Sequence, residues 1–300
     1  MLAYIFPGQG SQYVGMGKDL AAADARARAL FERADAALGV ALSTICFDGP
    51  DNDLKQTVNT QPAIFVHSMA MLALLDAAPA MVAGHSLGEY SALVAANVLA
   101  FEDAVRLVRL RGELMQQCGT EHPGTMAAVI GMDDAVLESV CADARAAGIV
   151  QPANYNSPGQ IVISGSVDGV REAMRIAKER GARMVKELNV SGAFHSPLME
   201  PAQDGLRTAI AGVTFRDATI PVYANVTAAP VQDAGEIKDL LVRQLTNPVR
   251  WSESVRAMAA NGGTDFLEVG PGSVLQGLVK RIATGVTTRG ADKWTDIHPA

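Results

Sequence analysis

A five-residue turn between an apolar segment of strand length and a helix limits the folds open to this chain. Residues 80–83 (AMVA) are all apolar, residues 84–88 (GHSLG) follow, and apolar residues then recur at helical spacing from Leu87 to Val98. The glycines of the turn allow the backbone to bend sharply without a Cβ clash. A buried strand that leads directly into a helix is typical of an α/β protein with a parallel sheet.

Other segments fit the same architecture. Further strands of this sheet are expected at residues 2–6 (LAYIF), 219–225 (TIPVYAN) and 265–269 (DFLEV), and helices at residues 19–38, 61–75 and 102–117. The segment 61–75 has Pro62 just inside its start and is apolar nearly all round, which is typical of a buried helix. The last dozen residues are polar, and we expect them to be loosely held.

A different pattern follows Gly124. Strand-like and helix-like segments succeed one another in the order β-α-β-β-α-β, which is the ferredoxin-like signature. The segments are residues 126–131, 133–147, 149–155, 160–164, 167–181 and 183–188. Pro152 falls in the second strand, an edge strand in this topology, where proline is tolerated.

We therefore expect an α/β fold with two parts. Residues 1–124 and 192–300 would form an α/β-hydrolase-like main domain with a parallel sheet, and this domain would carry the catalytic residues. Residues 125–191 would form an inserted, ferredoxin-like α+β subdomain. The length of 300 residues suits one large unit with an insert.

Composition excludes several classes of protein. The formal net charge of −7 argues against nucleic-acid binding, which needs a basic surface. The three cysteines, Cys46, Cys118 and Cys141, are widely spaced, which argues against a disulfide framework or a zinc site and for a reducing compartment. The chain has neither a signal-peptide pattern nor an uncharged apolar stretch of roughly 18 residues. We expect a cytoplasmic protein that does not cross a membrane.

Residues 84–88 also match G-x-S-x-G, a motif that presents a nucleophilic serine between a strand and a helix. The turn would lift the Ser86 hydroxyl into the open at a helix N-terminus, where the helix dipole favours developing negative charge. The motif is short enough to arise by chance, so a plain strand–turn–helix corner stays open as the alternative.

A serine hydroxyl is a weak nucleophile and needs a base, for which the chain offers five histidines. His67 lies in a predicted buried helix, His85 adjoins the serine and should point away from it, His122 lies in a loop, and His298 lies near the end. His195 lies where the chain leaves the predicted insert and re-enters the main domain. Loops at domain junctions often overhang clefts, so elimination favours His195 without excluding the others.

One charged residue of the helix at 102–117 falls on its apolar face. With about 100° per residue, Arg111 lies at about 140° from Arg106, within the arc that also holds Leu110 and Met115. A guanidinium keeps its charge when buried and therefore requires an anion and hydrogen bonds. Two interpretations stay open: a structural salt bridge with an internal Asp or Glu, or a fork that binds a substrate carboxylate through two parallel hydrogen bonds.

Eight segments, in order along nearly the whole chain, together resemble one family. They are FPGQGSQ (6–12), TQPA (60–63), GHSLGEYSALVAA (84–96), RLVRLRGELM (106–115), NYNSPGQ (154–160), GAFHS (192–196), RQLTNPVRW (243–251) and EVGPG (268–272). The family is that of the malonyl-CoA:acyl-carrier-protein transacylases, which includes the acyltransferase domains of polyketide synthases. Several of the segments are long and specific, so the resemblance is unlike a chance match.

The resemblance implies roles in catalysis for five residues. Ser86 would carry the acyl ester, and His195 would act as its base. The backbone N–H groups of Gln9 and Leu87 would form the oxyanion hole. This family lacks the triad acid, and a backbone carbonyl at the position of Gln244 would orient the His195 ring instead.

The resemblance also implies roles in substrate binding. Arg111 would bind the malonyl carboxylate, and Asn156 would face the site. In the polyketide branch, a leucine at Leu87 and a phenylalanine at Phe194 go with malonyl rather than methylmalonyl, because the ring shrinks the pocket. Gly192 resembles the residue found in the stand-alone enzymes of fatty-acid synthesis.

The activity implied by the resemblance is ping-pong transfer of a malonyl group. The donor would be malonyl-CoA and the acceptor the phosphopantetheine thiol of acyl carrier protein, with no metal or bound cofactor. Carrier proteins are acidic, so we expect a basic patch beside the cleft. The alternatives are a free-standing acyltransferase that serves a polyketide synthase or a malonate decarboxylase, a serine esterase or thioesterase, and a non-catalytic module that binds carrier protein.

Overall fold

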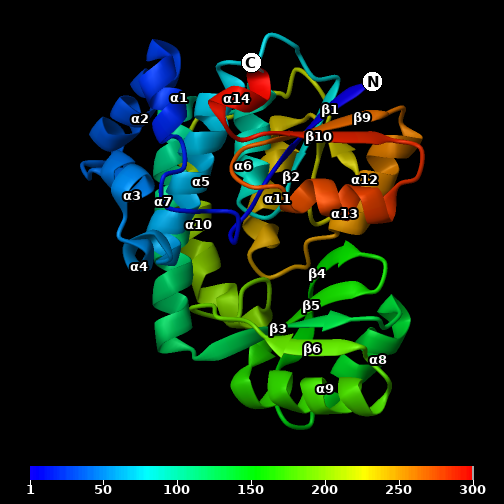
Figure 1. Ribbon diagram of the computed structural model, residues 1–300. Coiled ribbons are helices and arrows are strands. Elements are labelled where there is room, and N and C mark those ends of the chain that lie inside the picture. Colours follow the sequence, from blue (N-terminus) through cyan, green and yellow to red (C-terminus); the bar gives the residue numbers. More distant parts are fainter. Residues whose placement is uncertain (299–300) are drawn as a thin grey trace.

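The computed structural model describes residues 1–298, and these residues form two β-sheets (Figure 1). The larger sheet has the strand order β10-β9-β1-β2-β7-β8, and neighbouring strands are parallel except for the pair β7 and β8. Its strands are β1 (Leu2–Phe6), β2 (Met81–Gly84), β7 (Val222–Tyr223), β8 (Pro230–Val231), β9 (Asp265–Val269) and β10 (Thr287–Ala291). The predicted α/β fold with a parallel sheet is confirmed.

The central strand β1 shows that helices cover both faces of this sheet. Tyr4 and Phe6 pack on one side with α2 (Ala25–Leu38), α5 (Thr57–Leu72), α6 (Gly88–Ala95) and α7 (Phe101–Glu121). Ala3 and Ile5 pack on the other side with α12 (Trp251–Ala260) and α13 (Val274–Ile282) (Figure 1). Both faces are therefore apolar, as parallel sheets require.

The remaining helices complete the main part of the molecule. They are α1 (Lys18–Ala23), α3 (Leu42–Asp48), α4 (Asp51–Leu54), the 3₁₀ turn η1 (Pro197–Met199), α10 (Glu200–Ala211), α11 (Ala234–Gln244) and α14 (Trp294–Ile297). Within residues 1–298, no helix is both long enough and apolar enough to cross a membrane.

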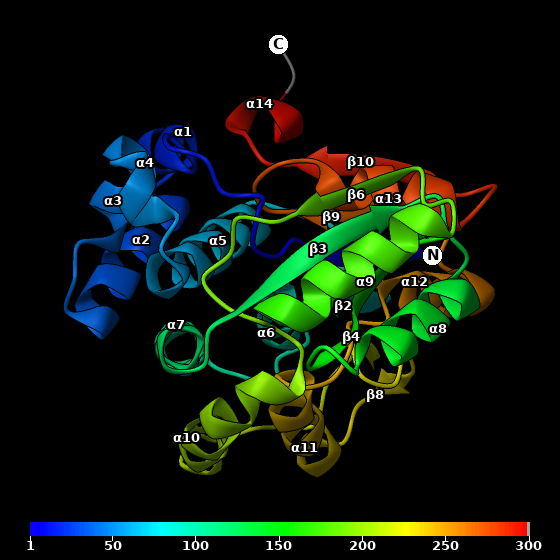
Figure 2. The ribbon, with the colours of Figure 1, turned by 90° about the horizontal axis from the view of Figure 1, so that it is seen from below.

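The second sheet is antiparallel and has the strand order β4-β5-β3-β6, which is the order of the ferredoxin-like fold. Its strands are β3 (Gly124–Ile130), β4 (Val150–Ser157), β5 (Gln160–Ser166) and β6 (Met184–Glu187). The helices α8 (Asp134–Ala144) and α9 (Val167–Glu179) cover one face of it (Figure 2). Pro152 lies on β4, at the edge of this sheet, as predicted.

The edge strand β4 also joins the small sheet to the rest of the molecule. The Tyr155 N–H donates to the Val249 carbonyl at 2.9 Å, and the Val249 N–H donates to the Ala153 carbonyl at 2.8 Å. These backbone hydrogen bonds fix β4 beside the segment that leads into α12. The two sheets are thus held next to each other at one edge of the smaller sheet.

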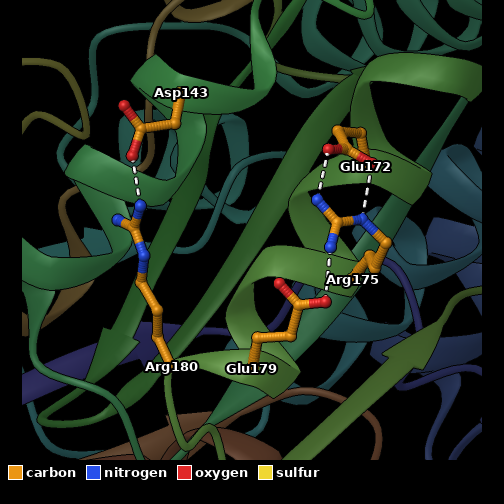
Figure 3. Close-up of polar contacts among 5 residues, drawn as sticks. All are labelled: Asp143, Glu172, Arg175, Glu179 and Arg180. Atoms are coloured by element: carbon orange, nitrogen blue, oxygen red, sulfur yellow. Dashed lines mark hydrogen bonds and ion pairs between the residues drawn. The ribbon is translucent and has the colours of Figure 1, made fainter.

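The helices α8 and α9 present ion pairs on the side of the small sheet away from the main sheet (Figures 1 and 3). Arg175 donates to Glu172 at 2.9 and 2.7 Å and also contacts Glu179, one turn further along α9. Arg180 pairs with Asp143 of α8. These side chains are partly or largely exposed, so each pair contributes only about 0.2–0.5 kcal/mol.

The buried helix α5 begins earlier than predicted, so Pro62 lies inside it rather than near its start. A proline has no N–H to donate to the carbonyl of the residue four positions before it, here Val58. The structure supplies another donor, because Arg109 Nη1 lies 3.2 Å from that carbonyl oxygen. The helix therefore continues through Pro62 without leaving this acceptor unsatisfied.

Other boundaries also differ from the predictions. The helix expected at residues 19–38 is divided into α1 and α2, because Asp24 is extended and accepts from the Arg26 N–H at 2.7 Å. The strand expected at residues 219–225 shortens to β7. The tail, expected to be loose, contributes to the edge strand β10 and forms α14, while residues 299–300 lie outside the described residues.

Candidate active site

Ser86 lies in a turn in which packing requires both glycines. A Cβ on Gly84 would lie 1.8 Å from the Gly88 carbonyl carbon, and a Cβ on Gly88 would lie 2.2 Å from the Phe6 carbonyl oxygen. Ser86 itself has a φ of 52°, in the left-handed region that few residues with a side chain adopt. The serine is therefore held in a strained turn between β2 and α6, as in a nucleophile elbow.

His195 approaches Ser86 from the loop that follows the small sheet. Its Nε2 lies 2.8 Å from Ser86 Oγ, and its Nδ1 lies 2.8 Å from the backbone carbonyl oxygen of Gln244. A carbonyl oxygen only accepts hydrogen bonds, so Nδ1 carries the proton and Nε2 presents its lone pair to the serine hydroxyl. The fold brings these three residues together from distant parts of the chain.

The environment of His195 keeps its imidazole neutral. The residue is 3% exposed. Burial and the nearby positive charge of Arg111 lower the pKa of His195 to about 3. An uncharged imidazole is available near neutral pH to accept a proton from a hydroxyl or a thiol.

Arg111 of α7 is 1% exposed and reaches the same serine. Its Nη2 donates to Ser86 Oγ and to Gln244 Oε1, both at 3.0 Å. Its Nη1 donates to Gln61 Oε1 at 2.7 Å, and the guanidinium carbon lies 5.8 Å from the centre of the Tyr90 ring. All of its hydrogen bonds to described residues go to uncharged groups, so within residues 1–298 Arg111 forms no salt bridge with an internal Asp or Glu.

The loop after β1 lies against the turn at residues 84–88, here called the nucleophile turn after the G-x-S-x-G motif that it matches. A Cβ on Gly8 would lie 2.5 Å from the His85 carbonyl oxygen, which shows how closely the two segments approach. Gln9, in this loop, and Leu87, in the turn, line the same cavity as Ser86. Neither backbone N–H donates to another described residue, so both are free to donate to a group in the cavity.

The cavity at Ser86 has a volume of about 290 Å³. It is lined by the loops that follow β1 and β2, by the helices α5, α7 and α13, and by strands of the small sheet. Asn156 and Phe194 are among them. The Oδ1 of Asn156 lies 2.8 Å from His85 Nε2, and the Phe194 side chain is 6% exposed. Gln244 is fully buried and lies behind the side chains of the cavity wall.

Sequence reasoning missed two buried polar residues that hold the nucleophile turn. Asn225 accepts from the Ser86 N–H at 2.7 Å and donates to the Gly84 carbonyl at 2.6 Å. The Oε2 of Glu89 accepts from the Asn225 N–H at 3.0 Å and from Gln244 Nε2 at 2.9 Å. Burial raises the pKa of Glu89 to about 7. The only signal in the sequence is that Glu89 and Asn225 are each a polar residue within an otherwise apolar segment.

Comparison with known proteins agrees with this geometry. Residues 3–289 match the acyl transferase domain family. The malonyl CoA-acyl carrier protein transacylase of Escherichia coli (strain K12) is 47% identical over 289 residues, which are 95% of this chain and 94% of that protein.

Solved structures of malonyl transferases are also similar to this chain. An acyl carrier protein S-malonyltransferase from Vibrio cholerae is 45% identical, with a TM-score of 0.94 over 99% of this chain and 98% of that one. A malonyl-transacylase in complex with its type II polyketide synthase acyl-carrier protein is 41% identical, with a TM-score of 0.96 over 99% and 97% of the two chains. The chain therefore belongs to the malonyl-CoA:acyl-carrier-protein transacylase family of acyl transferase domains.

Proposed function

We propose that this chain transfers a malonyl group from malonyl-CoA to the phosphopantetheine thiol of an acyl carrier protein, through an ester on Ser86. One observation carries the proposal: a neutral base and a buried cation both contact the same hydroxyl. His195 Nε2 lies 2.8 Å and Arg111 Nη2 lies 3.0 Å from Ser86 Oγ. Such a site suits an acyl group that ends in a carboxylate.

In the first half-reaction, Ser86 Oγ attacks the thioester carbon of malonyl-CoA while His195 Nε2 takes the hydroxyl proton. The carbonyl π electrons move to the oxygen, and the N–H groups of Gln9 and Leu87 stabilise the oxyanion. Donors of this kind contribute roughly 3–4 kcal/mol each in acyl transfer. The C–S bond then breaks, the CoA sulfur takes the proton from His195, and a malonyl ester remains on Ser86.

The second half-reaction reverses these roles. His195 Nε2 takes the proton of the phosphopantetheine thiol as the sulfur attacks the ester carbon. The same two N–H groups stabilise the second oxyanion, the C–O bond to Ser86 breaks, and Oγ recovers its proton from His195. The Gln244 carbonyl holds the imidazole in one orientation through both steps. No bound cofactor enters either step.

Arg111 would select the acyl group. Burial lowers the pKa of Arg111, but a guanidinium stays protonated at any pH at which proteins fold. Its Nη2 contacts Ser86, and its Nε, on the same edge of the guanidinium, has no partner among residues 1–298. That edge offers a bidentate site for a carboxylate, so a malonyl group would bind it and an acetyl group would leave the cation unpaired.

The acceptor would bind at the mouth of the cavity. Val274 and Leu278 of α13 line the cavity, and Lys280 and Arg281 follow them on the exposed side of the same helix. Arg281 Nη1 donates to Oε1 of Gln160, another lining residue, at 2.7 Å. Carrier proteins are acidic, so we assign these two cations to the expected basic patch. The related malonyl-transacylase that was solved with its carrier protein supports an acceptor of this kind.

The two parts of the chain would have different roles in the reaction. Residues 1–124 and 192–300 would form the catalytic domain and residues 125–191 the small subdomain, which contributes Asn156 to the cavity wall. We place the reaction in the cytoplasm. The same transfer serves fatty-acid synthesis, polyketide synthesis and malonate decarboxylase systems, and the carrier protein that docks decides among them.

A transfer assay tests this function. The protein would be mixed with malonyl-CoA and a phosphopantetheinylated carrier protein, and malonyl-carrier and free malonate would be quantified together. We expect malonyl-carrier to be the main product and to disappear with Ser86→Ala. Free malonate as the main product would instead identify a serine hydrolase.

A further inference from the structure

A continuous line of buried polar groups runs from Glu89 to Arg111 behind the cavity. Glu89 is 2% exposed and lies in the first turn of α6, three residues after the nucleophile. Its Oε2 accepts from Gln244 Nε2 at 2.9 Å, and Gln244 Oε1 accepts from Arg111 Nη2 at 3.0 Å. One side-chain amide therefore connects the buried carboxylate with the buried guanidinium.

The direction of the Gln244 amide is decided by its two neighbours. An amide side chain donates from nitrogen and accepts at oxygen, and a guanidinium only donates. Burial raises the pKa of Glu89 to about 7, but its Oε2 also accepts from the Asn225 N–H at 3.0 Å, so this oxygen is an acceptor whether or not the other carboxyl oxygen is protonated. The nitrogen must therefore face Glu89, which leaves the oxygen toward Arg111. The Ser86 carbonyl lies 3.0 Å from the same nitrogen and favours the same direction.

Loss of the carboxylate would remove the strongest of these constraints. Without it, the Gln244 side-chain amide could rotate so that its NH₂ group faced the Arg111 guanidinium. Two groups that only donate would then meet in a buried site, so the guanidinium would have to move away. The other amide that holds Arg111 belongs to Gln61, and among residues 1–298 its own nitrogen has only a weak acceptor, Met115 Sδ at 3.3 Å. Gln61 is thus less able to keep Arg111 in place alone.

We propose that Glu89 is a positioning residue for substrate selection: it fixes the direction of the Gln244 side-chain amide, whose oxygen holds Arg111 toward the carboxylate of the acyl group. This inference rests on the proposed malonyl transfer. Glu89 touches no reacting atom and acts through Gln244. Its distinctive consequence is a change in the preference between acyl groups, beyond any change in overall rate.

The test measures the rate of formation of the acyl-enzyme from malonyl-CoA and from acetyl-CoA. Glu89→Met removes the acceptor but keeps an unbranched side chain, and Glu89→Gln restores an acceptor oxygen. Gln244→Met removes the amide but keeps the backbone carbonyl that orients His195. Ser91→Ala is the matched control, since Ser91 is buried on the same helix and its Oγ has no partner among residues 1–298.

We expect the malonyl-to-acetyl ratio of kcat/KM to fall about tenfold or more in Glu89→Met and in Gln244→Met, with a raised KM for malonyl-CoA. Glu89→Gln should recover most of the ratio, and Ser91→Ala should keep it. An unchanged ratio in Glu89→Met, with both rates lowered alike, would overturn the inference. If Glu89→Met does not fold, an unchanged ratio in Gln244→Met overturns it equally. A wild-type protein that shows no preference for malonyl would instead refute the proposed function.

Discussion

The Nδ1 proton of His195 is held by the backbone carbonyl oxygen of Gln244, at 2.8 Å, in the place where many serine enzymes use a carboxylate. A carbonyl dipole orients the ring but carries no full negative charge to stabilise an imidazolium. Burial and Arg111 also disfavour the charged ring, and the pKa of His195 lies well below its ordinary value. The His195 imidazole is therefore kept in its neutral form, as the proposed base requires.

This low pKa predicts a flat pH profile on the acid side. Between pH 7.5 and 5.5 His195 stays unprotonated, because its pKa is lowered to about 3. Glu89 takes up a proton in this range, because its pKa is raised to about 7, but its Oε2 remains an acceptor for Gln244 Nε2. The kcat/KM for self-acylation by malonyl-CoA should therefore change by no more than about threefold. The measurement is the pH dependence of acyl-enzyme formation under single-turnover conditions. A loss of rate with an apparent pKa near 6.5 would show that the base titrates like an ordinary histidine.

Arg111 is predicted to determine the preference for malonyl. Arg111→Ala should weaken malonyl loading by about 2–5 kcal/mol, because a desolvated carboxylate loses its partner, and should improve acetyl loading relative to malonyl loading. Arg111→Lys should recover only part of the lost malonyl loading, because an ammonium cannot form two parallel hydrogen bonds with a carboxylate. Rates with the two acyl-CoA substrates measure both effects.

The matched control is Arg106→Ala on the same helix. The Arg106 side chain is 55% exposed, and its one ion pair within the described part of the chain is a loose contact with Asp103 at 3.8 Å. We expect it to leave the rates with both acyl groups unchanged. Equal loading of malonyl and acetyl by the wild-type protein would contradict a role for Arg111 in selection.

Replacing Gly88 with any larger residue is predicted to destabilise the packing between β1 and the turn at residues 84–88. In Gly88→Ala the new Cβ would lie 2.2 Å from the Phe6 carbonyl oxygen, so β1 and the nucleophile turn must separate, at a cost of about 1–3 kcal/mol in the free energy of unfolding. Gly277→Ala on α13 is the control, since its Cβ would meet no atom within 4 Å. It should stabilise the helix by about 0.5–1 kcal/mol. Urea unfolding of both variants measures these changes, and an equal stability of Gly88→Ala and the wild-type protein would contradict the prediction.

The basic patch on α13 is predicted to act on the second half-reaction alone. Replacing both cations, as in Lys280→Glu with Arg281→Glu, should raise the KM for carrier protein, most strongly at low salt, and leave self-acylation by malonyl-CoA unchanged. Lys178→Glu, at an exposed position on α9 of the small sheet, is the control. Equal loss in both half-reactions would mean that the α13 variant disturbs the cavity rather than docking.

The strands, the small subdomain and the nucleophile turn could be predicted because their signals are local. The segment 2–6 is uniformly apolar, and the turn at 84–88 has its own motif. Residues 126–188 contain strand-like and helix-like segments in the ferredoxin-like order. Strand β10 could not be predicted, because its own sequence carries no such local signal. It is an edge strand with the mixed sequence TTRGA, and its partner β9 supplies the pairing that the sequence itself does not indicate.

The buried polar groups behind the cavity could not be predicted, because their partners are far away in the chain. The hydrogen bond between Glu89 and Asn225 joins residues separated by 136 positions, and that between Gln244 and Glu89 joins residues separated by 155. Helical periodicity placed Arg111 on an apolar face, but only the fold shows that its partners are amides and a hydroxyl rather than a carboxylate.

Malonyl transfer through Ser86 is tested by the intact mass of the protein after mixing with malonyl-CoA and, separately, with acetyl-CoA. We expect a malonyl adduct in the wild-type protein that is absent from Ser86→Ala, with weak acetyl loading that improves relative to malonyl loading in Arg111→Ala. No adduct in the wild-type protein, or equal loading of the two acyl groups, would contradict malonyl transfer through Ser86.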